Sequence, residues 1–338
     1  MQPTIATNGM ATSVKQLAQT NRVFGAPPLF DPETGTTVIE PLGSDSGWWA
    51  GAPSALWTGD HYYLSYRVRR PQPERGGETR IAASSDGERF ETIWTGRKEQ
   101  FGTPSIERCA LVRTDSGRWR LYISYVDGVT DKWRIDLMEA DSPDAFDPAH
   151  RVPILTAEQI GAEGVKDPWV CQVGGVWHMI ASFATTPTDL AGDHGALHGT
   201  RDIYNTGHTK SCTGLATSVD GVQWQWGGVL LEPRDGAWDA YAARINTVVY
   251  RAPFWFGFYD GSKSVAENYE ERCGLAYSLD LHHWERLSIT GPAIGPNGGP
   301  GSVRYVEAVQ GPDWVRYYYE YTRPDGSHEL RTRRVSLQ

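Results

Sequence analysis

The sequence has little cysteine and no long apolar stretch. Its 338 residues include four cysteines that lack Cys-x-x-Cys spacing and lie in apolar strand contexts, Cys109, Cys171, Cys212 and Cys273. We expect buried free thiols rather than disulfides. No run of about 18 apolar residues offers a membrane helix, and residues 1–20 lack the charged and apolar parts of a signal peptide. A cytoplasmic protein without a membrane partner is expected.

Basic residues are in the minority. The sequence has 32 lysines and arginines against 41 aspartates and glutamates, a formal net charge of −9, and no basic patch with interleaved aromatics. This balance argues against a nucleic-acid partner. A glycine-rich phosphate loop, a dinucleotide-binding fingerprint and a serine nucleophile elbow are also missing. We expect no cofactor.

Aromatic residues, by contrast, are abundant and recur in a pattern. Five aromatic-rich runs each follow a short turn with glycine or aspartate: HYYLSYR from His61, RWRLYISY from Arg118, VWHMIASF from Val176, FWFGFY from Phe254 and WVRYYYEY from Trp314. Their lead aromatics, Tyr62, Trp119, Trp177, Trp255 and Trp314, are 57, 58, 78 and 59 residues apart. One unit therefore recurs five times, with a long insertion between the third and fourth units.

Each aromatic run has strand signals on both sides. A short strand precedes it, as in APSAL from Ala52, and a strand ending in a polar turn and a bulky residue follows it, as in GLATSVDGVQW from Gly214. No long amphipathic helix interrupts the middle of the chain. We predict an all-β fold, a five-bladed β-propeller with a central channel. It is expected to be a single domain over residues 1–338, with residues 1–45 as an N-terminal extension packing on the propeller.

Carboxylates occur where the predicted inner strands start, which is where propellers bind ligands. Three consecutive units supply one each, Glu107, Asp167 and Asp239. Hydrolysis of a glycosidic bond needs one carboxyl group to protonate the leaving oxygen and another to activate water or attack carbon. We therefore predict that Glu107, Asp167 and Asp239 are catalytic.

One of these segments carries a family resemblance. VKDPWV, from Val165 to Val170, followed by GGVWHMIASF, resembles the Asp-Pro strand start of the five-bladed propeller glycoside hydrolases of families 43, 32, 68, 117 and 130. The segment WDAYAARINTVV from Trp238 is similar to their fourth blade, and the resemblance covers the chain from about Trp48 onward. It implies a glycosidase in which Asp167 stabilises the oxocarbenium-like state or raises the pKa of the acid, with Lys166 beside it.

The first blade departs from that pattern. Those families usually carry the nucleophile or general base there, but this chain has GAPSAL, with Ala52 in place of the aspartate. Asp45 could reach in from the preceding loop, or the catalytic set could be shifted to the three carboxylates named above, which we favour. Alternatively the chemistry is replaced, as in the phosphorylases of family 130, with phosphate cradled by Lys166, Arg244 and Arg304.

The remaining candidates are substrate-binding residues. They are Trp48 and Trp49, on which a sugar ring could stack, Glu270 in the loop of the fourth unit, His194 in the long insertion, and Tyr305 and Glu307 in the fifth unit. Tyr305 and Glu307 are two apart and should share one face of a strand. The insertion is predicted to be a lid over the channel mouth. Its glycines argue against the helix that a zinc site would need, so no metal is expected.

Taken together, these features predict a glycoside hydrolase-like enzyme that acts on a small furanoside or a short oligosaccharide by carboxylate acid/base catalysis. The alternative is a non-hydrolytic propeller: a glycoside phosphorylase, a repurposed biosynthetic enzyme or a carbohydrate-binding protein. The missing aspartate at Ala52 favours that alternative.

Overall fold

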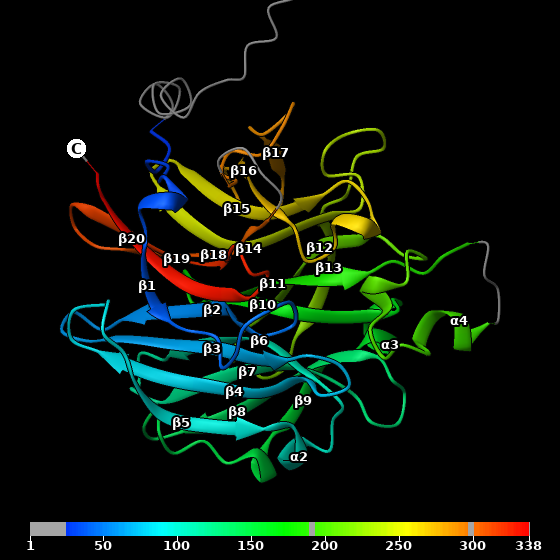
Figure 1. Ribbon diagram of the computed structural model, residues 1–338. Helices are drawn as coiled ribbons and strands as arrows, with labels where there is room; N and C mark the ends of the chain where they lie inside the picture. Colours follow the sequence, from blue (N-terminus) through cyan, green and yellow to red (C-terminus); the bar gives the residue numbers. More distant parts are fainter. Residues whose placement is uncertain (1–24, 189–192, 297–300, 338) are drawn as a thin grey trace, which may run out of the picture.

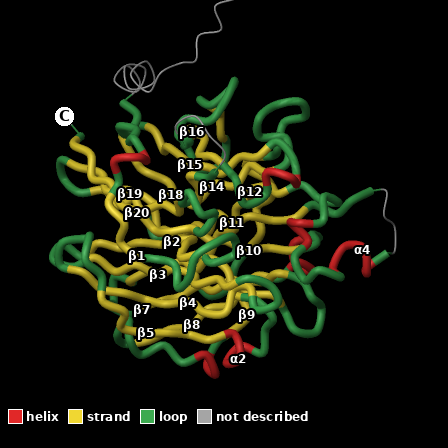
Figure 2. Tube along the Cα trace, viewed as in Figure 1, coloured by secondary structure: helices red, strands yellow, loops and turns green. Residues whose placement is uncertain are grey.

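The computed structural model describes residues 25–188, 193–296 and 301–337, and within them strands dominate (Figures 1 and 2). The helical segments of this part of the chain have three to five residues each: η1 Pro32–Thr34, α2 Lys98–Phe101, η2 Pro148–His150, α3 Ala157–Ile160, α4 His194–His198, η3 Ile203–Asn205 and η4 Val265–Glu267. The all-β prediction is confirmed.

The strands pair antiparallel in successive groups of four. The first group is β2 Trp49–Trp57, β3 Tyr62–Arg70, β4 Arg75–Ser84 and β5 Glu91–Arg97; the second is β6 Ile106–Arg113, β7 Trp119–Val126, β8 Trp133–Ala140 and β9 Val152–Leu155. The third is β10 Gly164–Val173, β11 Val176–Ala184, β12 Ser211–Ser218 and β13 Gln225–Leu231; the fourth is β14 Ala242–Arg251, β15 Phe254–Ser262, β16 Arg272–Ser278 and β17 Trp284–Arg286. The fifth is β18 Val303–Gln310, β19 Trp314–Thr322, β20 His328–Ser336 and, from the start of the chain, β1 Thr36–Ile39.

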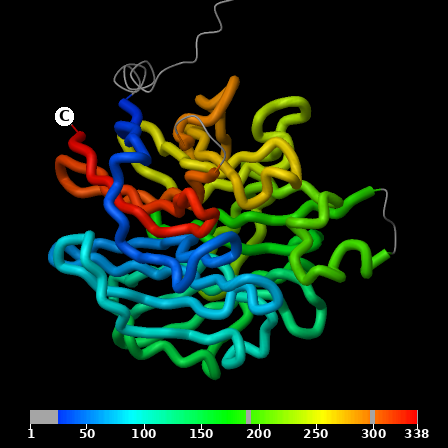
Figure 3. The backbone as a smooth tube through the Cα atoms, viewed as in Figure 1, coloured from blue at the N-terminus to red at the C-terminus, as the bar shows by residue number. Residues whose placement is uncertain are grey.

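The two ends of the described chain meet in the fifth group. Strand β1 pairs antiparallel with β20, with Thr36 opposite Thr332, and Figure 3 shows the blue start of the described chain beside the red C-terminal strands. Part of the predicted N-terminal extension is thus a strand of the last group. The pairing ties residues from opposite ends of the sequence into one sheet.

The five aromatic runs form the second strands, β3, β7, β11, β15 and β19, and their large side chains fill the spaces between neighbouring groups. Tyr122 of β7, for example, is fully buried, and its hydroxyl donates to the Gly221 carbonyl of the third group at 2.9 Å. The first strands of the groups contact one another in the order β2, β6, β10, β14, β18 and back to β2. These inner strands therefore surround a common centre.

Each inner strand is interrupted at a similar level. The pairing register shifts between Gly51 and Ser54, Ile106 and Cys109, Lys166 and Trp169, Ile245 and Thr247, and Arg304 and Glu307. Such bulges re-aim side chains and often occur beside active sites. Because each bulge shifts the register, two side chains that are two residues apart across a bulge need not lie on the same face of the strand.

The four cysteines are free, three of them buried and Cys171 half-buried. No helix in the described ranges is long and apolar enough to cross a membrane.

Candidate active site

A small polar cavity lies among the inner strands, at the level of their bulges. Every strand group contributes to its wall, together with the long insertion and the β15–β16 loop: Arg69, Glu107, Lys166, Asp202, Tyr204, Arg244, Asn268, Tyr269, Glu271, Arg304 and Tyr305. The cavity volume is about 10 Å³, which is room for about one water molecule. Five of the predicted site residues therefore line one cavity: Glu107, Lys166, Arg244, Arg304 and Tyr305.

Asp167 and Tyr305 meet beside this cavity, although they come from the third and fifth groups. The Tyr305 hydroxyl donates to Asp167 Oδ2 at 3.2 Å, and the Asp167 backbone N–H donates to Ser124 Oγ at 2.9 Å. Asp167 is only 2% exposed, and its Oδ1 has no hydrogen-bond partner among the described residues. Burial, with the Asp167 and Glu107 carboxyl groups nearby, raises the pKa of Tyr305 well above its ordinary value. The neutral Tyr305 hydroxyl therefore donates to one oxygen of Asp167, while the other oxygen of Asp167 has no hydrogen-bond partner among the described residues.

Lys166 contacts the same carboxyl group. Its Nζ lies 3.4 Å from Asp167 Oδ2 and sits over the rings of Trp133 and Tyr204, 4.9 Å and 4.7 Å from their centroids. The ammonium group is thus held by two aromatic faces as well as by the carboxylate. This contact keeps a cation beside Asp167 in a buried position.

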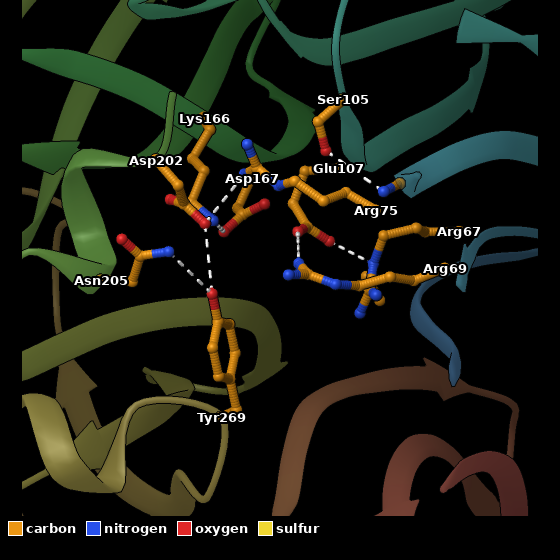
Figure 4. Close-up of polar contacts among 12 residues, drawn as sticks. Arg67, Arg69, Arg75, Ser105, Glu107, Lys166, Asp167, Asp202, Asn205 and Tyr269 are labelled. Atoms are coloured by element: carbon orange, nitrogen blue, oxygen red, sulfur yellow. Dashed lines mark hydrogen bonds and ion pairs between the residues drawn. The ribbon is translucent and has the colours of Figure 1, made fainter. Parts of the chain in front are cut away.

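Glu107 is held by two arginines of β3 (Figure 4). Its Oε1 pairs with Arg67 Nε, and its Oε2 lies 4.0 Å from Arg69 Nη1. Arg67 and Arg69 are two residues apart, so they lie on one face of β3. Both oxygens of Glu107 therefore face guanidinium groups.

The far wall is a chain of alternating charges. Arg304 lies 2.8 Å from Glu271 Oε2 and 2.6 Å from Glu320 Oε1, and Arg244 contacts the other oxygen of Glu271. Burial opposes ionisation, but Arg244 and Arg304 lower the pKa of Glu271 to about 2, and Arg304 and Arg67 lower that of Glu320 well below its usual range. Glu271 and Glu320 are therefore ionised, and each forms ion pairs with two arginines.

Glu320 also occupies the space beside the bulge of the first group. Its Oε2 accepts the Ala52 N–H at 3.0 Å, and a Cβ added to Gly51 would come within 1.6 Å of that oxygen. Glycine at position 51 is thus needed for the close approach of this carboxylate. A carboxylate does sit at the first inner strand, but it comes from β19 and is paired with Arg67 and Arg304.

The long insertion closes another side of the cavity. Asp202 lies 3.0 Å from Arg75 Nη2, and its Oδ2 accepts the Tyr269 hydroxyl at 3.3 Å (Figure 4). The insertion therefore supplies two wall residues, Asp202 and Tyr204. Residues 189–192 of this segment lie outside the described residues.

Arg108, on β6 of the second group, contacts three other groups. Its Nε donates to the Pro53 carbonyl at 2.9 Å, its Nη1 donates to the Pro168 carbonyl at 3.3 Å, and its Nη2 pairs with Glu307. Glu307 is bound to Arg108 and does not line the cavity. The bulge at Tyr305 and Val306 separates its side chain from that of Tyr305.

Asp239 is not part of the site. It is fully buried, its oxygens lie 2.9 Å from both Arg234 Nη2 and Arg286 Nε, and it accepts the Tyr259 hydroxyl at 3.1 Å. The residue precedes β14, and the ion pairs hold it within the fourth group. Asp239 therefore does not line the cavity, and a catalytic role for it stays a prediction.

Three predicted binding residues also lie elsewhere. Glu270 is exposed, whereas its neighbour Glu271 lines the cavity. His194 is exposed on α4, where its ring packs against His198, and the half-buried Trp48 packs on Gly43. We do not retain Glu270, His194 or Trp48 as contacts of a ligand in the cavity.

Trp49, by contrast, packs directly on the charged wall. Its ring stacks on His328 with centroids 4.5 Å apart and contacts the Arg69 and Arg304 guanidinium groups at 4.6 Å and 5.1 Å from its centroid. Tyr269 packs against it at 5.0 Å. The tryptophan is buried, so it supports the arginines rather than presenting an open stacking face.

Among the described residues, no three histidine, cysteine, aspartate or glutamate side chains are arranged to hold a metal ion.

Asp260 lies behind the bulge of β18 and is fully buried. It accepts the Tyr305 backbone N–H at 3.0 Å, and its Oδ2 is 3.7 Å from Arg244 Nη2. Burial raises the pKa of Asp260 to about 7; Arg244 opposes this shift, and the Glu271 carboxylate adds to it. Its protonation state therefore changes near neutral pH.

Asp260→Asn should change how stability depends on pH. Below about pH 4 the carboxyl group is protonated in both the folded and the unfolded chain, whereas between about pH 4 and 7 only the folded chain keeps the proton. The free energy of unfolding of the wild type, relative to the variant, should be highest at low pH and fall by up to about 4 kcal/mol as the pH rises through 7. Urea unfolding of both proteins over this pH range measures the difference; a constant difference contradicts the assignment.

Comparison with known proteins adds the fold context. The sequence matches no protein-family model and no curated protein. Among solved structures, one described as a glycoside hydrolase has a TM-score of 0.66 at 13% sequence identity, over 96% of this chain and 95% of that one. A thermostable family-43 glycoside hydrolase has a TM-score of 0.62 at 15% identity, over 89% of this chain and 92% of that one.

A phosphorylase shares the architecture as well. The β-1,2-mannobiose phosphorylase from Listeria innocua has a TM-score of 0.56 at 14% identity, over 88% of this chain and 93% of that one. At such identities the similarity establishes the fold and not the reaction. The chain thus resembles the β-propeller glycoside hydrolases in its fold over nearly its whole length.

Proposed function

We propose that the protein is a glycoside hydrolase-like enzyme, a single-domain five-bladed propeller that acts on a small furanoside or a short oligosaccharide at the central cavity. The observation that carries the proposal is the buried Asp167, whose Oδ1 is free beside a cavity at the inner-strand bulges. The fold is shared with glycoside hydrolases and a phosphorylase, which bind substrates of this chemical class. The proposed partner is a small carbohydrate.

The two candidate carboxylates near the cavity have different surroundings. Asp167 has a free oxygen and contacts a phenol and an ammonium group, so it suits stabilisation of positive charge on the sugar. Glu107 is held by two arginines, so it suits the role of orienting the attacking water. Because Asp239 does not line the cavity, we propose Glu107 and Asp167 as the pair.

The cavity is too small for a substrate unless the side chains of its wall move. A volume of about 10 Å³ holds no sugar ring, so a ring enters only when side chains at the wall move. Asn268 and Tyr269 come from a surface connection between β15 and β16, and Tyr269 is attached to Asp202 by a hydroxyl contact of 3.3 Å. We propose that displacement of Tyr269 opens the site.

A second candidate function is phosphorolysis. Lys166, Arg244 and Arg304 all line the cavity, and arginine and lysine are the usual ligands of phosphate. Phosphate would then replace water as the attacking group, which would account for the missing first-blade base.

The proposed function is tested with a panel of aryl pentofuranosides and hexosides, with and without inorganic phosphate. Release of the aryl alcohol with free sugar supports hydrolysis, and phosphate-dependent release with a sugar 1-phosphate supports phosphorolysis. Glu139→Gln serves as the control variant, because Glu139 is exposed, pairs with Arg120 and does not line the cavity. No turnover of any glycoside under either condition would contradict the proposed function.

A further inference from the structure

Three inner strands share an unusual backbone position. In their bulges Ala52, Asp167 and Tyr305 have left-handed φ angles of 52°, 56° and 51°. This conformation is unfavourable for residues with a side chain, on the order of 1–3 kcal/mol, and such strain gathers at functional sites. The three residues therefore stand in equivalent places of the first, third and fifth strand groups.

Two of the three carry reactive atoms, and those atoms touch. Ala52 has no functional group, and its N–H is used by Glu320. The Tyr305 hydroxyl donates to Asp167 Oδ2 at 3.2 Å, and Tyr305 lines the cavity. The function that an aspartate at position 52 would supply is thus available from a phenol at the matching bulge of the fifth group.

Tyr305 is also rigidly held. It is 2% exposed, its backbone N–H donates to Asp260 at 3.0 Å, and the guanidinium groups of Arg304 and Arg244 lie 5.3 Å and 5.8 Å from its ring centroid. Neighbouring cations attract the negative charge that develops when a phenol gives up its proton. The burial that raises its pKa keeps the resting group protonated, so a base must remove the proton as the phenol reacts.

The other carboxylates of the wall are poorly suited to attack. Glu107 faces Arg67 and Arg69, Glu271 faces Arg244 and Arg304, and Glu320 faces Arg67 and Arg304. Oxygens engaged by guanidinium groups are weaker nucleophiles and bases than free ones. Asp167 differs from them because its ion-pair contact is with the Lys166 ammonium group and not with a guanidinium group, and its Oδ1 has no hydrogen-bond partner among the described residues.

We propose that Tyr305 is the catalytic nucleophile of this site, with Asp167 as the base that takes its proton. The proposal rests on the proposed function and names the group that replaces the missing first-blade carboxylate. Tyrosine forms covalent intermediates in enzymes when an adjacent base activates it.

The reaction has two balanced steps. In the first, Tyr305 Oη bonds to the anomeric carbon, the phenol proton moves to Asp167, and the electron pair of the broken glycosidic bond leaves on the departing oxygen. That oxyanion is stabilised by Lys166, Arg244 and Arg304 and then takes a proton from solvent. In the second, water oriented by Glu107 attacks the same carbon and releases a proton to solvent, which balances the proton taken up in the first step, and Tyr305 leaves and recovers its proton from Asp167.

Trapping of the intermediate tests the proposal. The wild type is incubated with 2-deoxy-2-fluoroglycosyl fluorides of the same pentoses and hexoses. The fluorine at C2 slows both the attachment of the sugar and its release, whereas the good leaving group at C1 speeds attachment only, so the adduct accumulates. Peptide mass spectrometry should find the sugar on the peptide that contains Tyr305, and the product of ordinary turnover should keep its anomeric configuration. Tyr305→Phe should lose the adduct and at least about 100-fold in kcat.

Tyr122→Phe is the matched control, because it removes an equally buried hydroxyl from the boundary of the second and third groups. It should keep the adduct and the wild-type rate. An adduct on a peptide containing Glu107 or Asp167, inversion of configuration, or turnover without any adduct would overturn the role of Tyr305 and leave the proposed function intact. If no glycoside is turned over, the proposed function fails and this inference fails with it. Should Tyr305→Phe not fold, the adduct and the stereochemistry of the wild type still decide the question.

Discussion

Asp167→Asn is expected to lower kcat about 10³-fold on the aryl glycoside that the wild type cleaves fastest. An amide accepts no proton from Tyr305, and it places no negative charge beside the sugar while positive charge develops. Both functions of Asp167 are lost together, so the loss should exceed that of a general base alone. The left-handed backbone at Asp167 is tolerated by asparagine, and the Tyr305 hydroxyl keeps an acceptor, so the fold should be retained.

The measurement is kcat and KM for wild type, Asp167→Asn and the Glu139→Gln control, with the thermal unfolding midpoint as a check of folding. The control should match the wild type, because exposed ion pairs contribute little to stability. Activity of the Asp167→Asn variant within about tenfold of the wild type would remove Asp167 from the mechanism and the activation of Tyr305 with it.

The strand order of this protein was predictable because it depends on local signals. Aromatic and β-branched residues alternate with polar ones over short runs, and turn residues separate the runs, so each second strand is visible in the sequence. The strand starts that carry Glu107, Lys166, Asp167, Arg304 and Tyr305 follow from that spacing. These five residues do converge.

What failed was the prediction of side-chain direction near bulges and in loops. Glu270 and Glu271 are adjacent, yet one is exposed and the other is fully buried between two arginines. Asp239 precedes β14 much as Asp167 lies near the start of β10, but arginines within and beside the fourth group bind it. Sequence periodicity does not distinguish these residues. Side chains in a loop follow no regular alternation, and a bulge shifts which face of the strand the following side chains point to.

The arginine network was missed for a different reason. Arg67 and Arg69 lie on the second strand of their group, and Glu320 on the second strand of another, 253 residues from Arg67. A search restricted to inner strands overlooks them. Charged residues two apart within an aromatic run, as in HYYLSYRVRR, were the available signal, because such a run is otherwise buried.

Glu320→Ala is expected to lower the free energy of unfolding by about 3–5 kcal/mol, because removal of one partner of a buried ion pair leaves the other charges uncompensated. Glu320 is fully buried and contacts Arg67, Arg304, His328 and the Ala52 N–H. Without it, two guanidinium groups would face each other beside the first inner strand. Urea unfolding of the wild type and the variant measures the loss.

Two further variants separate charge from shape. Glu320→Gln keeps the side-chain length and one acceptor oxygen, so it should lie between wild type and Glu320→Ala. Glu139→Ala removes an exposed partner of Arg120 and should cost less than about 1 kcal/mol. If Glu320→Ala were no more destabilising than Glu139→Ala, the ion pairs of Glu320 would not stabilise the contact between the first and fifth groups. The close approach of Glu320 to Gly51 would then contribute nothing measurable to stability.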